Sequence, residues 1–136
     1  MIVFNYELDF KLADESLYSD WIERVVTQHE FSLGELNYIF CDDAYLLKLN
    51  VEFLEHDTLT DIISFDYTMG KLVGGDVFIS LERVKENAHE LAHCFDEELK
   101  RVMIHGVMHY MGYKDKTGEE MKTMRSVEDT ALMLFK

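Results

Sequence analysis

Apolar residues recur along the chain at two different spacings, and these spacings predict where strands and helices lie. Residues 2–10 alternate between apolar and polar side chains, which is typical of a half-buried strand. Three further short apolar stretches are also predicted to form strands, at residues 34–41, 62–67 and 76–80. A turn around Gly70, or a loop ending at Gly74 and Gly75, is expected between the last two of them. The pattern therefore predicts four strands.

Helical spacing accounts for most of the remaining residues. The expected helix starts are residues whose side chains or charge suit a helix N-terminus: Asp14, Asp42–Asp43, Ser80, Asp96 and Thr117. Thr117 is followed three positions later by Glu120, which is the spacing of a capping box. The first helix should end near residue 29, the third near His93 and the fourth near Gly112. Together these elements predict an α+β fold, with a small mixed four-stranded sheet packed with about five helices.

Length and composition indicate one globular unit. The chain has 136 residues, 48% of them hydrophobic, and it contains no proline, so a single domain over 1–136 is expected. No apolar run approaches the roughly 18 residues that a membrane span needs, and the N-terminus lacks the pattern of a secretory signal. Cys41 and Cys94 form no spaced pair and are expected to be reduced thiols in the core. We therefore expect a cytoplasmic protein that does not enter a membrane.

The charge of the chain is strongly acidic but unevenly distributed. The formal net charge is −14, which counts against binding to nucleic acid. However, residues 1–99 hold 6 Lys and Arg against 22 Asp and Glu, whereas residues 100–136 hold 7 against 5. The C-terminal part is thus the part able to approach phosphate groups, although a solvated helix face is the ordinary explanation of such a cluster.

The stretch HGVMHYMGYKD, from His105 to Asp115, is the strongest candidate for chemistry. Two histidines four residues apart on a helix project from one face, so that both rings can reach one metal ion. Gly112 offers a helix end, after which the chain can turn back and bring Asp115 to the same ion. Two histidines and one carboxylate leave a coordination position open for water. The stretch therefore predicts a metal-dependent hydrolase.

This stretch resembles the signature of the YbeY endoribonuclease family, the bacterial rRNA maturation factors. The matching positions are His105, Gly106, His109, Gly112 and Tyr113. The resemblance continues upstream in three blocks that stand in the family's order: Leu49–Asn50, Thr60–Phe65 and Gly75–Ser80. It implies a four-stranded mixed sheet packed with helices. It also implies a single-strand-specific endoribonuclease that acts in 16S rRNA 3′ end maturation and ribosome quality control, with the rRNA of the small ribosomal subunit as its partner.

The chain departs from the family pattern at functional positions. Asp115 stands where the family has its third histidine, and Lys114 stands where the family has an aspartate. The expected metal is Zn²⁺. Because the ligand set His105, His109 and Asp115 is harder than three histidines, Ni²⁺, Mn²⁺ and Fe²⁺ are expected to compete with it. An arginine that the resemblance implicates in activity aligns with Leu54. Lys114 and Lys116 are therefore candidates for binding the substrate as point charges.

Other catalytic roles are less defined by the pattern. Asp61 and Ser64 are candidates for orienting water or substrate, with capping of a strand end as the alternative. His56 and Asp57 precede them and are candidates for facing the same cleft. Gly106 stands where peptidases of the H-E-x-x-H type place their base, and its lack of a side chain is expected to leave space beside the metal for a phosphodiester.

Two other functions compete with this interpretation. One is a non-catalytic ribosome-assembly factor whose metal mainly stabilises the fold, which Leu54 and the acidic composition favour. The other is a small zinc metallopeptidase, because His89, Glu90 and His93 form a literal H-E-x-x-H motif. The polar surroundings of that motif favour an exposed histidine pair instead. Non-heme iron oxygenases also use two histidines and a carboxylate, but on a β-barrel that this pattern does not suggest.

Overall fold

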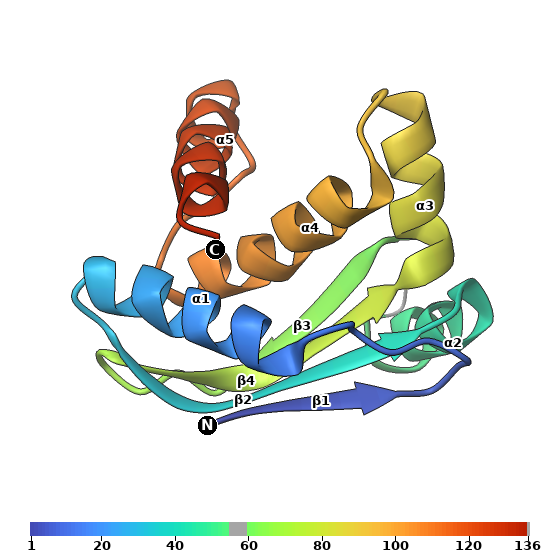
Figure 1. The fold of residues 1–136 in the computed structure, drawn as a ribbon, viewed down its shortest axis with the longest axis horizontal. Helices are drawn as coiled ribbons and strands as arrows, with labels where there is room; N and C mark the ends of the chain where they lie inside the picture. The colour runs from blue at the N-terminus through green and yellow to red at the C-terminus, as the bar shows by residue number, and fades with distance from the viewer. Residues whose placement is uncertain (55–59, 136) are drawn as a thin grey trace.

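A mixed sheet of four strands organises the residues that the computed structural model describes, 1–54 and 60–135. In chain order the elements are β1 (Ile2–Tyr6), α1 (Glu15–Gln28), β2 (Ser32–Cys41), α2 (Asp43–Leu54), β3 (Ile62–Asp66), β4 (Leu72–Ser80), α3 (Leu81–Glu90), α4 (Phe95–Tyr110) and α5 (Gly118–Met133). The strands lie in the order β1-β2-β4-β3. The first three are parallel, and β3 runs antiparallel at the edge (Figure 1). The predicted α+β class, with a mixed four-stranded sheet and five helices, is confirmed.

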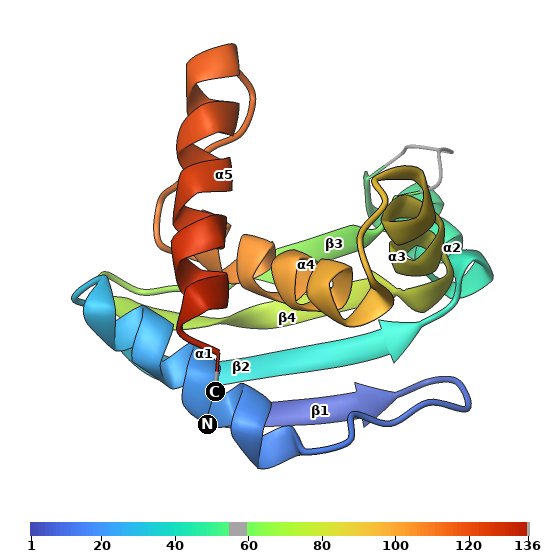
Figure 2. The same cartoon turned by 45° about the horizontal axis from the view of Figure 1, so that its top comes forward.

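The two faces of the sheet are covered by different helices. Alternate residues of β2 and β4 join buried side chains of α1 and α4 in the main core, whereas α2 packs on the other face over the smaller cluster of Cys41, Leu46 and Ile63. The helix α5 stands out from the sheet, and its C-terminal end lies beside α1 (Figure 2). The indole Nε1 of Trp21 on α1 donates to the carbonyl of Ala131 at 2.7 Å, so α5 is also tied to α1. Within the described residues, no helix is both long and apolar enough to cross a membrane.

Two strand boundaries differ from the prediction by more than two residues. The strand β1 ends at Tyr6 rather than at residue 10, although the ring of Phe10 still lies 5.8 Å from that of Phe40. The apolar alternation outlasts the strand because these loop side chains also contact the core. At the other end of the sheet, β4 begins at Leu72, so the two glycines expected in a loop belong to the strand.

Gly75 pairs with Leu36 of β2 and Asp66 of β3, and α4 and β3 approach it closely. A Cβ at this position would meet the carbonyl oxygen of Phe65 and would lie 2.7 Å from the Cζ of Tyr110. The Tyr110 hydroxyl lies within hydrogen-bond distance of the carbonyl oxygens of Phe65 and Asp76, at 3.0 and 2.9 Å. The glycine thus allows a tyrosine of α4 to reach the sheet backbone.

Most predicted helix starts are confirmed by their capping bonds. The side chains of Asp14 and Ser80 accept from backbone N–H groups of α1 and α3, and Thr117 forms the predicted capping box with Glu120. The helix α4 starts at Phe95, one residue before the expected position, and Cys94 at its N-cap makes no side-chain capping bond. Cys41 is buried as expected, but Cys94 is exposed, so the prediction of a second core thiol is wrong.

Candidate metal centre

The helix α4 lies close against the sheet because Gly106 faces β3 and β4. A Cβ on Gly106 would lie 3.2 Å from the Cδ1 of Ile62 and 3.3 Å from the Cγ1 of Val77. The space beside this glycine is therefore filled by sheet side chains. The expectation that the missing side chain leaves room for a phosphodiester is wrong, since the glycine serves the packing of helix on sheet instead.

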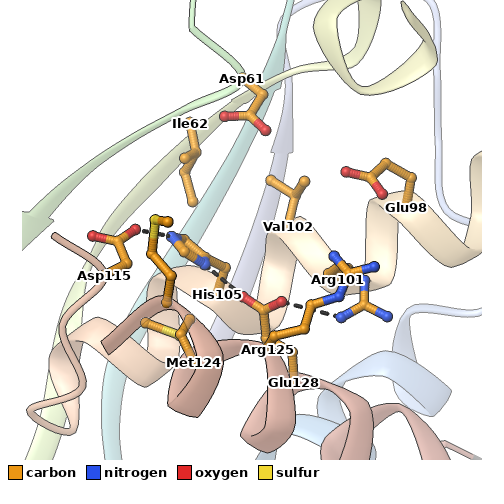
Figure 3. Close-up of a pocket in the computed structure, with 11 residues that line it drawn as sticks. Asp61, Ile62, Glu98, Arg101, Val102, His105, Asp115, Met124, Arg125 and Glu128 are labelled. Carbon is orange, nitrogen blue, oxygen red and sulfur yellow. Dashed lines mark hydrogen bonds and ion pairs between the residues drawn. The ribbon is translucent and has the colours of Figure 1, made fainter. Parts of the chain in front are cut away.

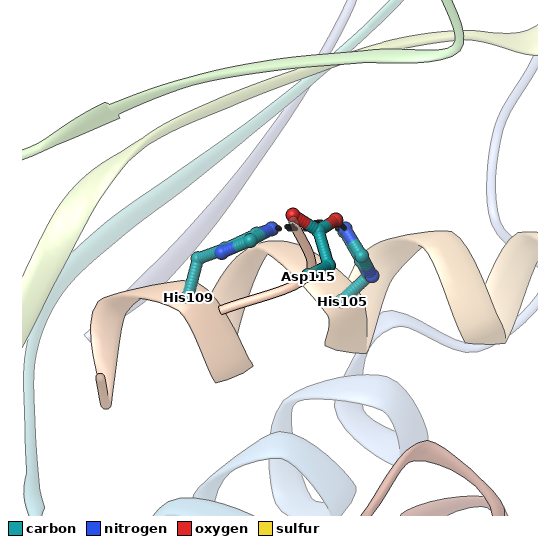
Figure 4. A group of neighbouring side chains, drawn as sticks. All are labelled: His105, His109 and Asp115. Atoms are coloured by element: carbon teal, nitrogen blue, oxygen red, sulfur yellow. Dashed lines mark hydrogen bonds and ion pairs between the residues drawn. The ribbon is translucent and has the colours of Figure 1, made fainter. Parts of the chain in front are cut away.

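Three ligand-type side chains converge at the C-terminal end of α4 (Figure 4). The Nε2 atoms of His105 and His109 are 3.0 Å apart. The Oδ2 of Asp115 lies 3.2 Å from the first nitrogen and 3.3 Å from the second. Asp115 and the two histidines are partly exposed, at 37%, 23% and 32%. The structure thus brings together the three residues that the sequence singled out.

The loop after α4 returns Asp115 to the helix in the predicted way. Gly112 has a φ of 100°, a conformation that favours glycine, and it follows directly after the last helical turn. The Tyr113 backbone N–H then donates to the Met108 carbonyl at 3.0 Å, which closes the reversal. The Nδ1 of His109 lies 3.0 Å from the Tyr113 carbonyl oxygen. One candidate ligand therefore holds the loop that carries another.

The hydrogen bonds of the two rings determine which nitrogen faces the centre. A carbonyl oxygen only accepts, so the Nδ1 of His109 carries the hydrogen that it donates to Tyr113. The Nδ1 of His105 lies 2.6 Å from the Oε2 of Glu128 and donates to that carboxylate. When the rings are neutral, both Nε2 atoms therefore bear lone pairs. These lone pairs point at each other and at the Asp115 carboxylate.

This arrangement fits a divalent cation. Three electron-pair donors at 3.0–3.3 Å repel one another unless a proton or a metal ion lies between them. A tetrahedral Zn²⁺ with bonds of about 2.0–2.1 Å separates neighbouring ligand atoms by roughly 3.3 Å. The observed separations match that spacing, and three protein ligands leave a fourth position for water. His105, His109 and Asp115 are thus the residues able to hold a metal.

The motif did not reveal a buried ionic network behind His105. Glu128 on α5 is 4% exposed, and its Oε1 lies 3.1 Å from the Nη1 of Arg101 on α4. The Nη2 of Arg101 contacts Asp129 at 2.8 Å. Burial lowers the pKa of His105, but its hydrogen bond to Glu128, the charge of Glu128 and the nearby Asp115 outweigh burial and raise that pKa. No short sequence spacing links Glu128 to His105, so sequence reasoning missed it.

A pocket of about 270 Å³ opens beside the candidate ligands, between α4, α5 and the start of β3. Its lining includes both charged and apolar side chains: Asp61, Ile62, Glu98, Arg101, Val102, His105, Asp115, Met121, Met124, Arg125 and Glu128 (Figure 3). Arg125 is exposed and adds a positive charge to this lining. Four carboxylate side chains nevertheless line the pocket against two arginines, and Arg101 is already paired with Glu128 and Asp129.

Asp61 lies at the start of β3 and lines the pocket that also holds His105 (Figure 3). Burial raises the pKa of its carboxyl group, and the charge of His105 and a hydrogen bond from Asn87 offset part of that rise. The Nδ2 of Asn87 donates to its Oδ2 at 3.2 Å, and its backbone carbonyl accepts from the Ser80 N–H. Asp61 is thus a carboxyl group held in place at the pocket.

The other predicted site residues lie around the pocket rather than in it. The described residues that line it do not include Ser64, Lys114 or Lys116. Ser64 lies exposed on β3, and Lys114 and Lys116 are exposed on either side of Asp115. Lys114 lines a separate groove with Gly112, Thr117 and others. Leu54 is the last residue of α2, and His56 and Asp57 lie outside the described residues.

The H-E-x-x-H motif does not form a helical ligand pair. The helix α3 ends at Glu90 rather than near His93, because Ala92 adopts a φ of 56°. His93 then contacts Glu98, with 3.3 Å between its Nδ1 and the Oε1. Among the described residues, His89 and His93 join no group of three or more ligand-type side chains. The geometry therefore gives no support to a peptidase centre at these residues.

A buried helix that packs on a mixed sheet presents two histidines, and the following loop adds a carboxylate, which together have the ligand set of a catalytic metal site with an open position. The model of the family described as endoribonuclease YbeY matches residues 4–136. The endoribonuclease YbeY of Flavobacterium johnsoniae is 55% identical over 99% of this chain and 97% of its own length. That of Flavobacterium psychrophilum is 56% identical over 99% and 96%. The chain belongs to the endoribonuclease YbeY family.

A solved structure shows the same fold. The solution structure of a protein from Thermotoga maritima superposes with a TM-score of 0.67 at 23% identity, covering 98% of this chain and 90% of that one. Family and fold together confirm the resemblance seen in the sequence and the predicted class, since the family is one of hydrolytic, metal-dependent endoribonucleases.

Proposed function

We propose that this chain cleaves single-stranded RNA at the centre formed by His105, His109 and Asp115, with water as the attacking group. Its proposed substrate is precursor 16S rRNA in the small ribosomal subunit, where it matures the 3′ end and acts in ribosome quality control. The proposed metal is Zn²⁺, with Ni²⁺, Mn²⁺ and Fe²⁺ as competitors, and the proposed location is the cytoplasm. The whole chain, 1–136, is proposed to act as one domain.

The convergence of three electron-pair donors carries this proposal. Both Nδ1–H groups are already used, one by Glu128 and one by the Tyr113 carbonyl, so that the Nε2 atoms remain for a metal. When bound, a divalent ion supplies a water of lowered pKa and polarises a phosphoryl oxygen. The family assignment supports an RNA phosphodiester as the substrate of this chemistry.

The remaining pocket residues are given positioning roles. Asp61, held by Asn87, is proposed to orient the attacking water from the β3 side of the pocket. Ser64, on the adjoining strand β3, is proposed to contact the substrate beyond Asp61. Arg125 lines the pocket, and Lys114 and Lys116 flank Asp115. These three cations are proposed to attract the phosphates of the strand in place of the family arginine that Leu54 replaces.

The test combines metal content with RNA cleavage in wild type, His109→Ala and His93→Ala proteins. We expect one equivalent of metal and cleavage of a labelled single-stranded RNA in wild type and His93→Ala, and loss of both in His109→Ala. A duplex of the same sequence should stay intact, and a chelator should stop cleavage. Circular dichroism confirms that each protein is folded.

Two results would overturn the proposal in different ways. Metal lost in His93→Ala but kept in His109→Ala would move the centre to the H-E-x-x-H residues. Metal bound by wild type without cleavage of any single strand, including the 3′ precursor of 16S rRNA, would favour the assembly factor. That alternative gains support from the pocket, where Asp61, Glu98, Asp115 and Glu128 outnumber the two arginines.

A further inference from the structure

Glu128 contacts the candidate metal centre from a different helix and a distant part of the sequence. It lies on α5, 23 residues after His105, and its side chain is almost fully buried. Its Oε2 lies 2.6 Å from the Nδ1 of His105, and Figure 3 shows the carboxylate between this ring and Arg101. A carboxylate buried this deeply is costly unless all its partners are in place. Its contacts are therefore expected to be specific.

We propose that Glu128 is a positioning residue that makes His105 a competent metal ligand. This inference rests on the proposed metal centre and names a residue on which that centre depends. By accepting from Nδ1–H, Glu128 keeps the hydrogen away from Nε2, the atom that faces His109 and Asp115. It also fixes the orientation of the ring. Carboxylates that bind the far nitrogen of a metal-ligating histidine typically strengthen metal affinity 10–100-fold.

Arg101 holds Glu128 in this role. Its Nη1 binds the Oε1 of Glu128 at 3.1 Å, leaving Oε2 for His105, and its Nη2 binds Asp129 at 2.8 Å. The guanidinium donates a charge-assisted hydrogen bond to one carboxylate oxygen, and the other oxygen accepts from the ring. Because both carboxylates lie on α5 and Arg101 lies on α4, the docking of α5 and the geometry of the metal centre are coupled.

The second histidine does not depend on a side chain in this way. The Nδ1 of His109 is held by the backbone carbonyl of Tyr113. Substitution of Glu128 should therefore disturb one ligand and leave the other intact. The effect should be a graded loss of affinity rather than the complete loss expected when His109 is removed.

The chain offers a matched control in Glu98. This glutamate is 5% exposed, lines the same pocket and contacts a histidine that is not a candidate ligand, His93, at 3.3 Å. Glu98→Gln therefore removes the same charge from the same pocket, with no contact to the centre. General electrostatic effects on metal binding should be alike in Glu98→Gln and Glu128→Gln.

The first experiment measures Zn²⁺ affinity by competition with a chromophoric chelator, below the unfolding temperature of every variant. We expect the dissociation constant for Zn²⁺ to be 10–100-fold larger in Glu128→Ala than in wild type. The increase should be smaller in Glu128→Gln, whose amide oxygen still accepts a hydrogen bond, and the constant should change little in Glu98→Gln. Unchanged affinity in both Glu128 variants, with loss in His109→Ala, would overturn this inference alone. Failure of wild type to bind Zn²⁺ would overturn the proposed centre and this inference with it.

The second experiment reads the tautomer of His105 in the metal-free protein by long-range ¹H–¹⁵N NMR. In wild type and Glu98→Gln, we expect the neutral ring to carry its hydrogen on Nδ1. In Glu128→Ala the Nε2–H form should become populated, a change that a merely structural role of Glu128 would not produce. A ring that keeps the same tautomer in Glu128→Ala would contradict the proposed role.

Discussion

Replacing Gly75 by alanine tests how α4 is anchored to the sheet behind the candidate centre. The added Cβ would meet the carbonyl oxygen of Phe65 and would lie 2.7 Å from the Cζ and hydroxyl oxygen of Tyr110. Forcing a methyl group into such a contact costs about 1–3 kcal/mol. If Tyr110 moves, its buried hydrogen bond to the sheet is also lost, at about 1–3 kcal/mol. We therefore expect a loss of about 2–6 kcal/mol, a large part of a typical domain stability of about 5–15 kcal/mol.

Equilibrium denaturation in urea measures this loss, and Gly118→Ala is its matched control. Among the described residues, apart from its chain neighbours and the backbone of its own helix, no heavy atom lies within 4 Å of a Cβ built on Gly118, so the same chemical change should alter stability there by less than about 0.5 kcal/mol. Adding Tyr110→Phe removes the hydroxyl that the new methyl meets, so the double variant should lose less than the sum of the single losses. A Gly75→Ala protein as stable as wild type would refute the reasoning.

Three further predictions follow from the same contacts. Zn²⁺ at about 100 times its dissociation constant should stabilise the protein by about 2.7 kcal/mol in thermal unfolding, reversibly with a chelator; an equal gain in His109→Ala would contradict the proposed centre. Gly106→Val should lower the urea midpoint of unfolding, since the added carbons would clash with Ile62 and Val77. A variant as stable as wild type would show that these side chains can rearrange to accept the valine. Ser80→Ala removes the cap of α3 and a 2.7 Å bond to Asp43, so a loss of about 1–2 kcal/mol is expected, and a loss below about 0.3 kcal/mol would argue against that cap.

Local patterns predicted the elements because the forces behind them act over a few residues. The capping box at Thr117 and Glu120, the cap at Ser80 and the reversal at Gly112 each involve neighbours within five positions. The strand and helix periods follow from which faces must be buried. Boundaries were wrong where a distant part of the chain decided them. Gly75 belongs to β4 because it pairs with Leu36 of β2 and Asp66 of β3, which no local pattern contains.

The ligand triad was predictable for the same reason. His105 and His109 are one helical turn apart, and Asp115 follows six residues after His109, so a single turn brings the three together. The literal H-E-x-x-H motif looked equally local, yet the left-handed backbone at Ala92 ends α3 before His93. The sequence motif alone did not reveal that the helix ends between its two histidines.

The amino-acid sequence thus determined the secondary structure, the fold class and the three candidate ligands, because each depends on spacing within a short segment. Tertiary structure alone decided what surrounds the ligands. Glu128 reaches His105 from 23 residues away, Arg101 is held by two carboxylates of α5, and Gly106 faces the sheet rather than the pocket. These contacts join segments that are far apart in the chain, and they exist only once α4 is packed between the sheet and α5.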